Sequence, residues 1–388
     1  MSNDSFTEVT SQSWFGRLGN AFKGIIVGII MVTIAFPLLF WNEGRAVKRY
    51  KTLQEGGGAV VSIAADKVDA INQGKLVHLI GKAVTEETLT DQIFGVSIPA
   101  IKLMRVAEMY QWQQESHSEE KKKLGGGTET TTTYTYNKIW TDNLINSGSF
   151  KKPEGHQNPA QMEYQSQEIV AGKVTVGAFT MSPSLVRKMK GYTPAALGSD
   201  YQLPDNFTDR AQVASNTIYL GNDPASPQVG DMRVSFQEVK PMDISLIASQ
   251  LNETFEPYRA KAGGTIELLE PGVHSADAMF QQALKSNTIL TWVLRGVGFI
   301  VMLFGLQLIL TPLSVFADVL PILGSIVGMG TGLVAGLSAA ILSSLTISVA
   351  WFVYRPVIGI IMLAIAGGGG FFLFTRLKKT PPVETAAK

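Results

Sequence analysis

The chain has 388 residues, and its 33 basic and 32 acidic side chains leave it nearly neutral. This balance argues against a nucleic-acid-binding protein, which normally shows a basic face, so no nucleic-acid partner is expected. Charged residues make up only 17% and hydrophobic ones 45%, a composition too apolar for a largely disordered chain. The absence of cysteine excludes disulfides, thiolate metal sites, cysteine nucleophiles and iron–sulfur clusters.

The apolar residues gather in four uncharged stretches, each long enough for a membrane-spanning helix of about 20 residues. They lie at 24–42, 296–317, 319–354 and 356–375. A purely soluble protein is therefore excluded. The sequence predicts one N-terminal and three C-terminal transmembrane helices in a multi-pass membrane protein.

The first stretch, 24–42, resembles a retained signal anchor rather than a cleaved signal peptide. It follows a polar segment of 23 residues and ends without a small-x-small cleavage site. Trp41 suits the headgroup layer, and Pro37 is placed to kink the helix near its exit.

The C-terminal spans are predicted at 286–310, 324–351 and 356–375. Pro312 and Pro321 favour a separate interfacial or re-entrant segment at 311–323. Arg295 lies inside the second span. It marks either an ion-handling site or a residue that pairs within the bundle, and the structural role is preferred.

Flanking charges give conflicting indications of sidedness. Basic residues beside the ends of the chain favour cytoplasmic segments at 1–23 and 376–388, whereas Arg45, Lys48, Arg49 and Lys51 favour the opposite arrangement. We expect both termini in the cytoplasm and the block 43–285 to be extracytoplasmic. The expected location is the cell inner membrane, or the endoplasmic reticulum or inner nuclear membrane in a eukaryote.

The block 43–285 carries most of the charge, and β-favouring residues with period-two alternation dominate it. The predicted fold is thus an α+β membrane protein with a large β-rich domain between the first and second spans. A short helix is expected after Ser182, and 113–127 reads as a solvated loop. The expected strands are 76–84, 128–140, 174–179, 233–239 and 265–269.

Motifs for catalysis or cofactor binding are missing from the sequence. The four histidines have no metal-ligand spacing, and there is no phosphate loop, nucleophile elbow or dinucleotide fingerprint. We predict no enzyme activity, no cofactor and no metal. Glu108 shares a strand face with Val106, Tyr110 and Trp112, so it is a candidate for acid–base work, although a hydrogen-bonded structural glutamate is preferred.

The third span contains a stripe of small residues at every fourth position. Such a stripe permits close helix–helix contact, because small side chains let two backbones approach. Packing in a bundle or oligomer is preferred over general tolerance of small residues. The predicted packing residues are Gly324, Gly328, Gly332, Gly336 and Ala340, with Ser344 and Ser348 continuing the stripe.

Segments along nearly the whole chain resemble the LUMA family of four-span proteins. They are 42–47 (NEGRAV), 72–78 (NQGKLVH), 106–112 (VAEMYQW), 134–140 (YTYNKIW), 230–236 (GDMRVSF), 286–288, 291–292 and 351–356 (WFVYRP). The resemblance implies one span, a luminal or periplasmic domain and three further spans. It also implies self-association, with a link to ion-channel behaviour, and supplies no catalytic residue. Divergence and the lack of cysteine point to a prokaryotic member, to which the animal partners emerin and lamins do not transfer.

The leading hypothesis is a non-enzymatic membrane protein that self-associates and organises a membrane assembly through its extracytoplasmic domain. Expected partners are membrane lipids, further copies of the chain and unidentified membrane or envelope proteins. A bundle that conducts ions or handles lipid is the first alternative. A lipid-binding or catalytic central domain is the second.

Overall fold

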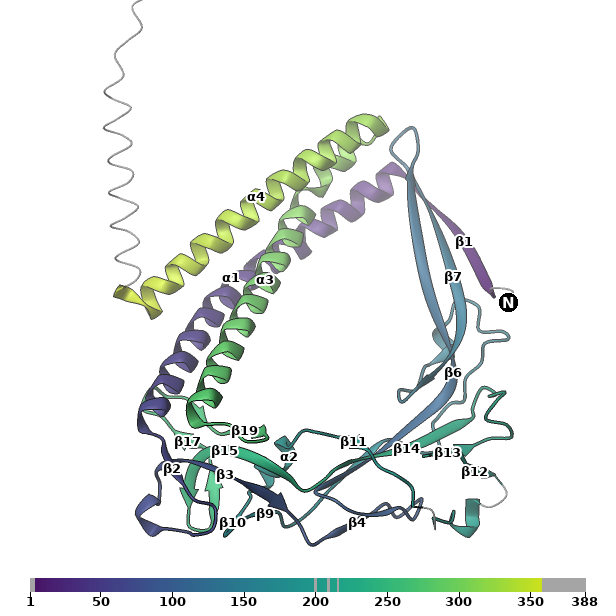
Figure 1. The fold of residues 1–388 in the computed structure, drawn as a ribbon. Coiled ribbons are helices and arrows are strands. Elements are labelled where there is room, and N and C mark those ends of the chain that lie inside the picture. The colour runs from purple at the N-terminus through teal and green to yellow at the C-terminus, as the bar shows by residue number, and fades with distance from the viewer. Residues whose placement is uncertain (1–3, 199–200, 208–209, 215, 358–388) are drawn as a thin grey trace, which may run out of the picture. The chain divides into compact units, whose positions relative to one another are not determined.

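The computed structural model describes residues 4–198, 201–207, 210–214 and 216–357 (Figure 1). The chain divides into two compact units. The β unit comprises Met1–Ser11, Thr52–Lys121 and Glu129–Ala283. The helical unit comprises Gln12–Lys51, Lys122–Thr128 and Leu284–Lys388.

Three long helices dominate the structure: α1 (Trp14–Ala59), α3 (Ala276–Ala317) and α4 (Pro321–Tyr354). Each is long and apolar enough to cross a membrane, by length and composition. The predicted spans 24–42, 286–310 and 324–351 lie inside them. The predicted fourth span and the tail fall on 356–388, of which residues 358–388 lie outside the described residues.

Helix α3 differs from the predicted break at Pro312, because it continues through this proline to Ala317. Proline removes one backbone hydrogen bond from the helix. Nearby hydroxyls bond to backbone carbonyls, Thr311 Oγ1 to Gln307 O at 2.8 Å and Ser314 Oγ to Thr311 O at 2.9 Å. The carbonyl that loses its helical donor at Pro312 is that of Leu308, four residues earlier, so these two bonds do not replace the missing one. Pro321 instead occupies the first turn of α4, where a missing N–H costs nothing.

Glycines let α1 and α3 approach closely inside the helical unit. A Cβ atom on Gly28 would lie 2.5 Å from Gly305 O, and one on Gly305 would lie 2.9 Å from Gly28 O. Below this crossing, Leu39 fills the space that Gly298 leaves. The apolar centre of the bundle consists of Ala35, Leu39, Met302 and Ala339, so α4 completes it.

The β unit contains two large sheets. The eight-stranded sheet has the order β1-β7-β6-β14-β13-β12, with β11 beside β14 and β8 beside β6. Its strands are β1 (Ser5–Gln12), β6 (Lys102–Lys122), β7 (Thr128–Thr141), β8 (Gln167–Val170), β11 (Thr193–Pro194), β12 (Ala211–Ala214), β13 (Thr217–Leu220) and β14 (Met232–Val239).

The seven-stranded sheet has the order β10-β9-β3-β15-β16, with β19 beside β15 and β2 beside β3. Its strands are β2 (Val61–Ile63), β3 (Leu76–Val84), β9 (Thr175–Val176), β10 (Phe179–Thr180), β15 (Met242–Leu251), β16 (Thr254–Glu256) and β19 (Leu268–Pro271). Two small pairs, β4 (Thr88–Thr90) with β5 (Ser97–Pro99) and β17 (Tyr258–Arg259) with β18 (Thr265–Ile266), and the short helix α2 (Pro183–Lys188) complete the unit.

Alternating side chains of these strands form one apolar core. Along β14, for example, Met232, Val234 and Phe236 are buried, whereas Arg233 and Ser235 between them are partly exposed. Phe94, Phe179 and Phe207 are among the largest fully buried side chains of the unit. The α+β class with a central β-rich domain is therefore confirmed.

The hairpin β6–β7 is longer than predicted. Residues 113–122, expected in a loop, continue β6, and the loop shrinks to 123–127. Charged side chains are compatible with this strand because both of its faces are exposed toward the tip. Pairing with β7 supplies the backbone hydrogen bonds that the charged sequence does not reveal.

The N-terminal strand β1 forms an edge of the same sheet, beside β7. Asp4 O accepts from Tyr136 N at 3.0 Å, Asp4 Oδ2 lies 2.8 Å from His156 Nε2, and the Glu8 carboxylate lies 2.8 Å from Lys151 Nζ. This pairing joins the segment 1–23 to the domain 43–285, which the sequence predicts on opposite sides of a membrane. Strands cannot pair across a bilayer, so β1 can pair with β7 only where both lie on the same side of the membrane.

Candidate functional site

A buried ion pair links the three helices where the apolar stretch of α1 ends. Arg295 on α3 donates to both oxygens of Glu43 on α1, at 2.6 and 2.9 Å, and Trp351 Nε1 on α4 donates to the same carboxylate at 2.8 Å. The Arg295 guanidinium also lies 4.8 Å from the ring centre of Trp292. All three helices thus meet at one carboxylate.

The environment of this pair explains why both charges are tolerated inside the bundle. Glu43 has 0% solvent exposure, so an unpaired carboxylate here would lose its hydration without compensation. Two charge-assisted hydrogen bonds from a planar guanidinium supply that compensation. The pairing favours the structural role for Arg295. In the sequence, Glu43 directly follows the first apolar stretch. This position was the signal that could have identified it as the partner of Arg295.

A second set of polar side chains lies about one helical turn from the Glu43–Arg295 pair. Arg45 Nη1 donates to Asn287 Oδ1 at 3.0 Å, and Nη2 donates to Thr291 Oγ1 at 3.0 Å and to Asn42 Oδ1 at 3.2 Å. Asn42 Nδ2 in turn donates to Thr291 O at 3.0 Å. These neutral partners hold the Arg45 guanidinium in place without cancelling its charge.

Another polar cluster surrounds Asp318, between α3 and α4. Its two oxygens each accept at 2.6 Å, one from Arg17 of α1 and the other from Lys122 of the hairpin tip. Gly324 leaves room for the carboxylate, since a Cβ there would lie 1.7 Å from Asp318 Oδ1. In the sequence, Asp318 is the single charge between the apolar stretches 296–317 and 319–354. A lone carboxylate between such stretches is itself a signal for a buried ion pair.

Glu108, the acid–base candidate, lies on β6 opposite Arg233 of β14. Arg233 Nε and Nη2 donate to its two oxygens at 2.7 and 3.2 Å, and the Arg233 guanidinium lies 4.7 Å from the ring centre of Trp140. Both carboxylate oxygens are therefore engaged by a cross-strand partner. This arrangement favours the structural glutamate over an acid–base group.

The small-residue stripe of α4 has different surroundings along its length. Gly324 packs against Asp318, and Gly328 just reaches Ser314, whereas a Cβ on Gly332 or Gly336 would meet nothing within 4 Å. The face that α4 turns toward its own bundle contains Ala335 and Ala339, both with 0% exposure. Among the described residues, Gly332, Gly336 and the exposed Ala340 thus contact no neighbouring helix closely.

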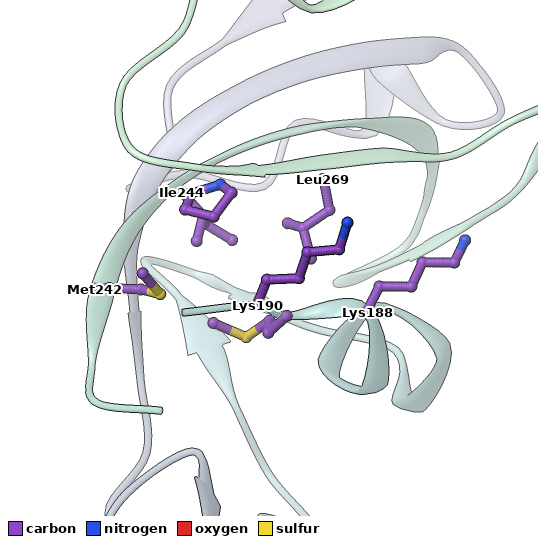
Figure 2. A pocket seen from close by; sticks show the side chains of 7 residues that line it. Lys188, Lys190, Met242, Ile244 and Leu269 are labelled. Carbon is purple, nitrogen blue, oxygen red and sulfur yellow. The ribbon is translucent and has the colours of Figure 1, made fainter. Parts of the chain in front are cut away.

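A small hollow lies on the surface of the β unit, where Lys188, Lys190, Met242, Ile244 and Leu269 gather (Figure 2). Met189 and Pro271 complete its lining. Its volume of about 10 Å³ holds one water molecule, far below the several hundred Å³ that a small organic ligand needs. This hollow offers no support for a ligand-binding or catalytic role of the central domain.

The histidines remain dispersed in the structure. His78 lies 3.2 Å from Ser62 Oγ and 2.9 Å from the carbonyl oxygen of His274, while His156 stacks on Tyr136. Within the described ranges, no three histidine or acidic side chains are arranged to hold a metal ion.

Comparison with known proteins agrees with the LUMA resemblance. The family model of Transmembrane protein 43 matches residues 109–356. The human protein of that name is 34% identical over 363 residues, which cover 90% of this chain and 89% of the relative. This chain belongs to the Transmembrane protein 43 family, also called LUMA. The resemblance is therefore confirmed.

Further members of the Transmembrane protein 43 family match over similar lengths. The mouse protein is 34% identical over 92% of this chain and 91% of its own length. The homologue from Drosophila melanogaster is 29% identical over 90% of this chain and 94% of its own length. No solved structure matches the chain. Membership of a transmembrane family supports the multi-pass membrane character predicted from the sequence.

Proposed function

We propose that this protein is a non-enzymatic integral membrane protein whose copies associate through α4. In this proposal the β unit lies outside the cytoplasm and binds membrane or envelope proteins. The family name supports the membrane character, and the names of the curated relatives contain no enzyme activity. The fold of the β unit, with exposed edges and a water-sized hollow, suits a binding surface better than a reaction chamber.

The open half of the small-residue stripe carries the self-association proposal. Glycines in a helix cost roughly 1 kcal/mol each relative to alanine in water-soluble helices. Within membranes, close helix contact offsets this cost. Gly28 and Gly305 make such a contact with each other, whereas Gly332 and Gly336 make none with the part of the chain that the structure describes. A second copy of α4 is the partner that their spacing fits.

Ion conduction receives less support from the structure. This alternative rests on polar residues inside the predicted spans: Arg295, Gln307 and the serine- and threonine-rich stretch 343–348. In the bundle Arg295 is neutralised by Glu43, Ser343 is buried against Met302, and Ser348 bonds to a carbonyl of its own helix. Side chains engaged in this way do not need a water-filled path.

Disulfide trapping tests the proposal directly, because the chain contains no cysteine. Ala340→Cys introduces a single thiol on the stripe, and Ile341→Cys introduces one at the same depth about 100° around the helix. In native membranes under mild oxidation, we expect a covalent dimer from Ala340→Cys and little from Ile341→Cys. Equal trapping of both variants, or of neither, together with a monomeric particle by mass photometry, would refute association through the stripe.

A further inference from the structure

An apolar groove runs between α1 and α4 close to the Glu43 carboxylate. It has a volume of about 490 Å³, within the range of ligand sites in proteins. Tyr354 lies close to the backbone of α1 at Gly44. The glycine makes this contact possible, because a Cβ atom on Gly44 would lie 2.5 Å from the tyrosine ring. The lining residues are Phe36, Pro37, Phe40 and Trp41 of α1 and Thr346 and Tyr354 of α4.

On each of the two helices, a cationic side chain comes after the residues that line this groove. On α1, Lys48 comes seven residues after Trp41, which places it on the same face about 10 Å further along the helix. On α4, Arg355 comes directly after Tyr354, and its guanidinium lies 5.9 Å from the ring centre of Trp351. The described residues include no carboxylate in salt-bridge distance of Lys48 or Arg355. Glu43, the acidic residue of this region, is already bound by Arg295 and Trp351.

Aromatic residues indicate the depth of the site in a membrane. Trp41 and Tyr50 on α1 and Trp292 on α3 are all exposed. Tryptophan and tyrosine concentrate at the boundary between the hydrocarbon and the headgroups. The groove then lies on the hydrocarbon side of this boundary, and Lys48 and Arg355 lie at headgroup level.

We propose that this groove binds one anionic phospholipid, with an acyl chain along Phe40 and Trp41 and the phosphate between Lys48 and Arg355. Charge decides between the possible occupants. The uncharged segment 356–375 would cover the apolar lining but would bring no negative charge to the two cations. Free phosphate would satisfy the cations and leave the groove empty. A phospholipid with net negative charge matches both parts of the site, and this inference is independent of self-association.

Native mass spectrometry of the full chain, purified from vesicles of phosphatidylcholine and phosphatidylglycerol in equal amounts, tests this site. We expect phosphatidylglycerol to be retained preferentially. Lys48→Gln combined with Arg355→Gln should reduce the preference roughly 25-fold, at about fivefold per cation. The matched control, Lys51→Gln combined with Lys285→Gln, removes the same charge and should change the preference little.

A second pair of variants tests the groove itself. Thr346→Trp fills it and should abolish retention of the lipid, whereas Leu345→Trp, on an exposed position of α4, should not. Melting temperatures without added lipid show that each variant is folded. Unchanged retention in Thr346→Trp, or an unchanged preference in the double glutamine variant, would overturn the proposal. It would also fail if inorganic phosphate alone raised the melting temperature as much as phosphatidylglycerol.

Discussion

Arg295 of α3 pairs with Glu43 of α1, although the two residues lie 252 positions apart in the sequence, with most of the β unit between them. The guanidinium makes a two-pronged contact with a carboxylate that has no solvent exposure, and Trp351 adds a third helix to the same site. The Glu43 carboxylate has no solvent access that could replace its partner, whereas the Arg295 side chain keeps 16% exposure. The pair therefore specifies which faces of α1, α3 and α4 meet.

Removing one member of this pair should destabilise the helical unit strongly. Arg295→Gln leaves a buried carboxylate without its cation, which typically costs about 3–5 kcal/mol. We expect a large fall in melting temperature in detergent, measured by intrinsic tryptophan fluorescence. Glu43→Gln should act in the same direction.

The double variant Glu43→Leu with Arg295→Met separates charge from packing. Replacing both members of a buried pair with apolar residues is often nearly neutral. Most of the lost stability should therefore return. If the double variant is as unstable as Arg295→Gln, the contribution of this site comes from hydrogen-bond geometry rather than from an unpaired charge.

Gly332→Leu should impair self-association without disturbing the fold of a single chain. Among the described residues nothing lies within 4 Å of a Cβ atom placed on this glycine, so in our proposal the added side chain meets a second copy. We expect a smaller particle by mass photometry and a lower melting temperature of the oligomer. Leu333→Ala, one residue around the helix, should do much less. Unchanged particle size in Gly332→Leu would mean that the stripe faces lipid.

The position of the N-terminus can be tested by one engineered disulfide. Thr7 of β1 and Thr133 of β7 have hydroxyl oxygens 3.5 Å apart. The chain has no native cysteine that could compete with cysteines introduced at these two positions. Thr7→Cys combined with Thr133→Cys should form an intramolecular disulfide in native membranes, seen as a reducible mobility shift. Thr7→Cys combined with Thr90→Cys, on β4, should not form one. Failure of the first pair to link would place residue 7 away from the β unit.

Acid should weaken the contribution of Glu168 to stability. The Tyr192 hydroxyl donates to this carboxylate and lowers its pKa, Lys102 adds to the effect at 3.2 Å, and partial burial opposes it. A lowered pKa stabilises the fold at pH values above the unfolded pKa, and the contribution is lost as the pH falls through the folded pKa. The difference in melting temperature between wild type and Glu168→Gln should therefore shrink below about pH 4.

The exposed Glu86 provides the control for this pH dependence. Glu86→Gln should leave the melting temperature and its pH profile close to those of the wild type. A gap for Glu168→Gln that persists at pH 3 would show that the charge of the carboxylate does not stabilise the fold.

Local sequence patterns predicted the elements that depend on local chemistry. Strand β3 was expected at 76–84 and occupies those residues, because an apolar run with Leu, Val and Ile favours a strand there. The three helices followed from uncharged length alone. Such features need no knowledge of distant partners.

Features that depend on contacts between residues far apart in the sequence could not be predicted from local patterns. Arg295 was predicted to pair within the bundle, but only the fold shows that Glu43 is its partner. The Gly28 and Gly305 contact was missed because each glycine is ordinary within its own helix. The continuation of α3 through Pro312 was not predicted, because a rule based on proline alone ignores that a long apolar helix tolerates one missing backbone hydrogen bond.

Strand β1 also sets an order of events during synthesis. It ends at Gln12, and its partner β7 begins only at Thr128, so at about 5–20 residues per second the ribosome needs roughly ten seconds to produce the partner. The apolar residues 24–42 emerge during this interval and reach the translocation machinery first. Strand β1 must therefore remain unpaired while the first membrane helix is inserted. Its sequence, SFTEVTSQ, is polar enough to do so without aggregating.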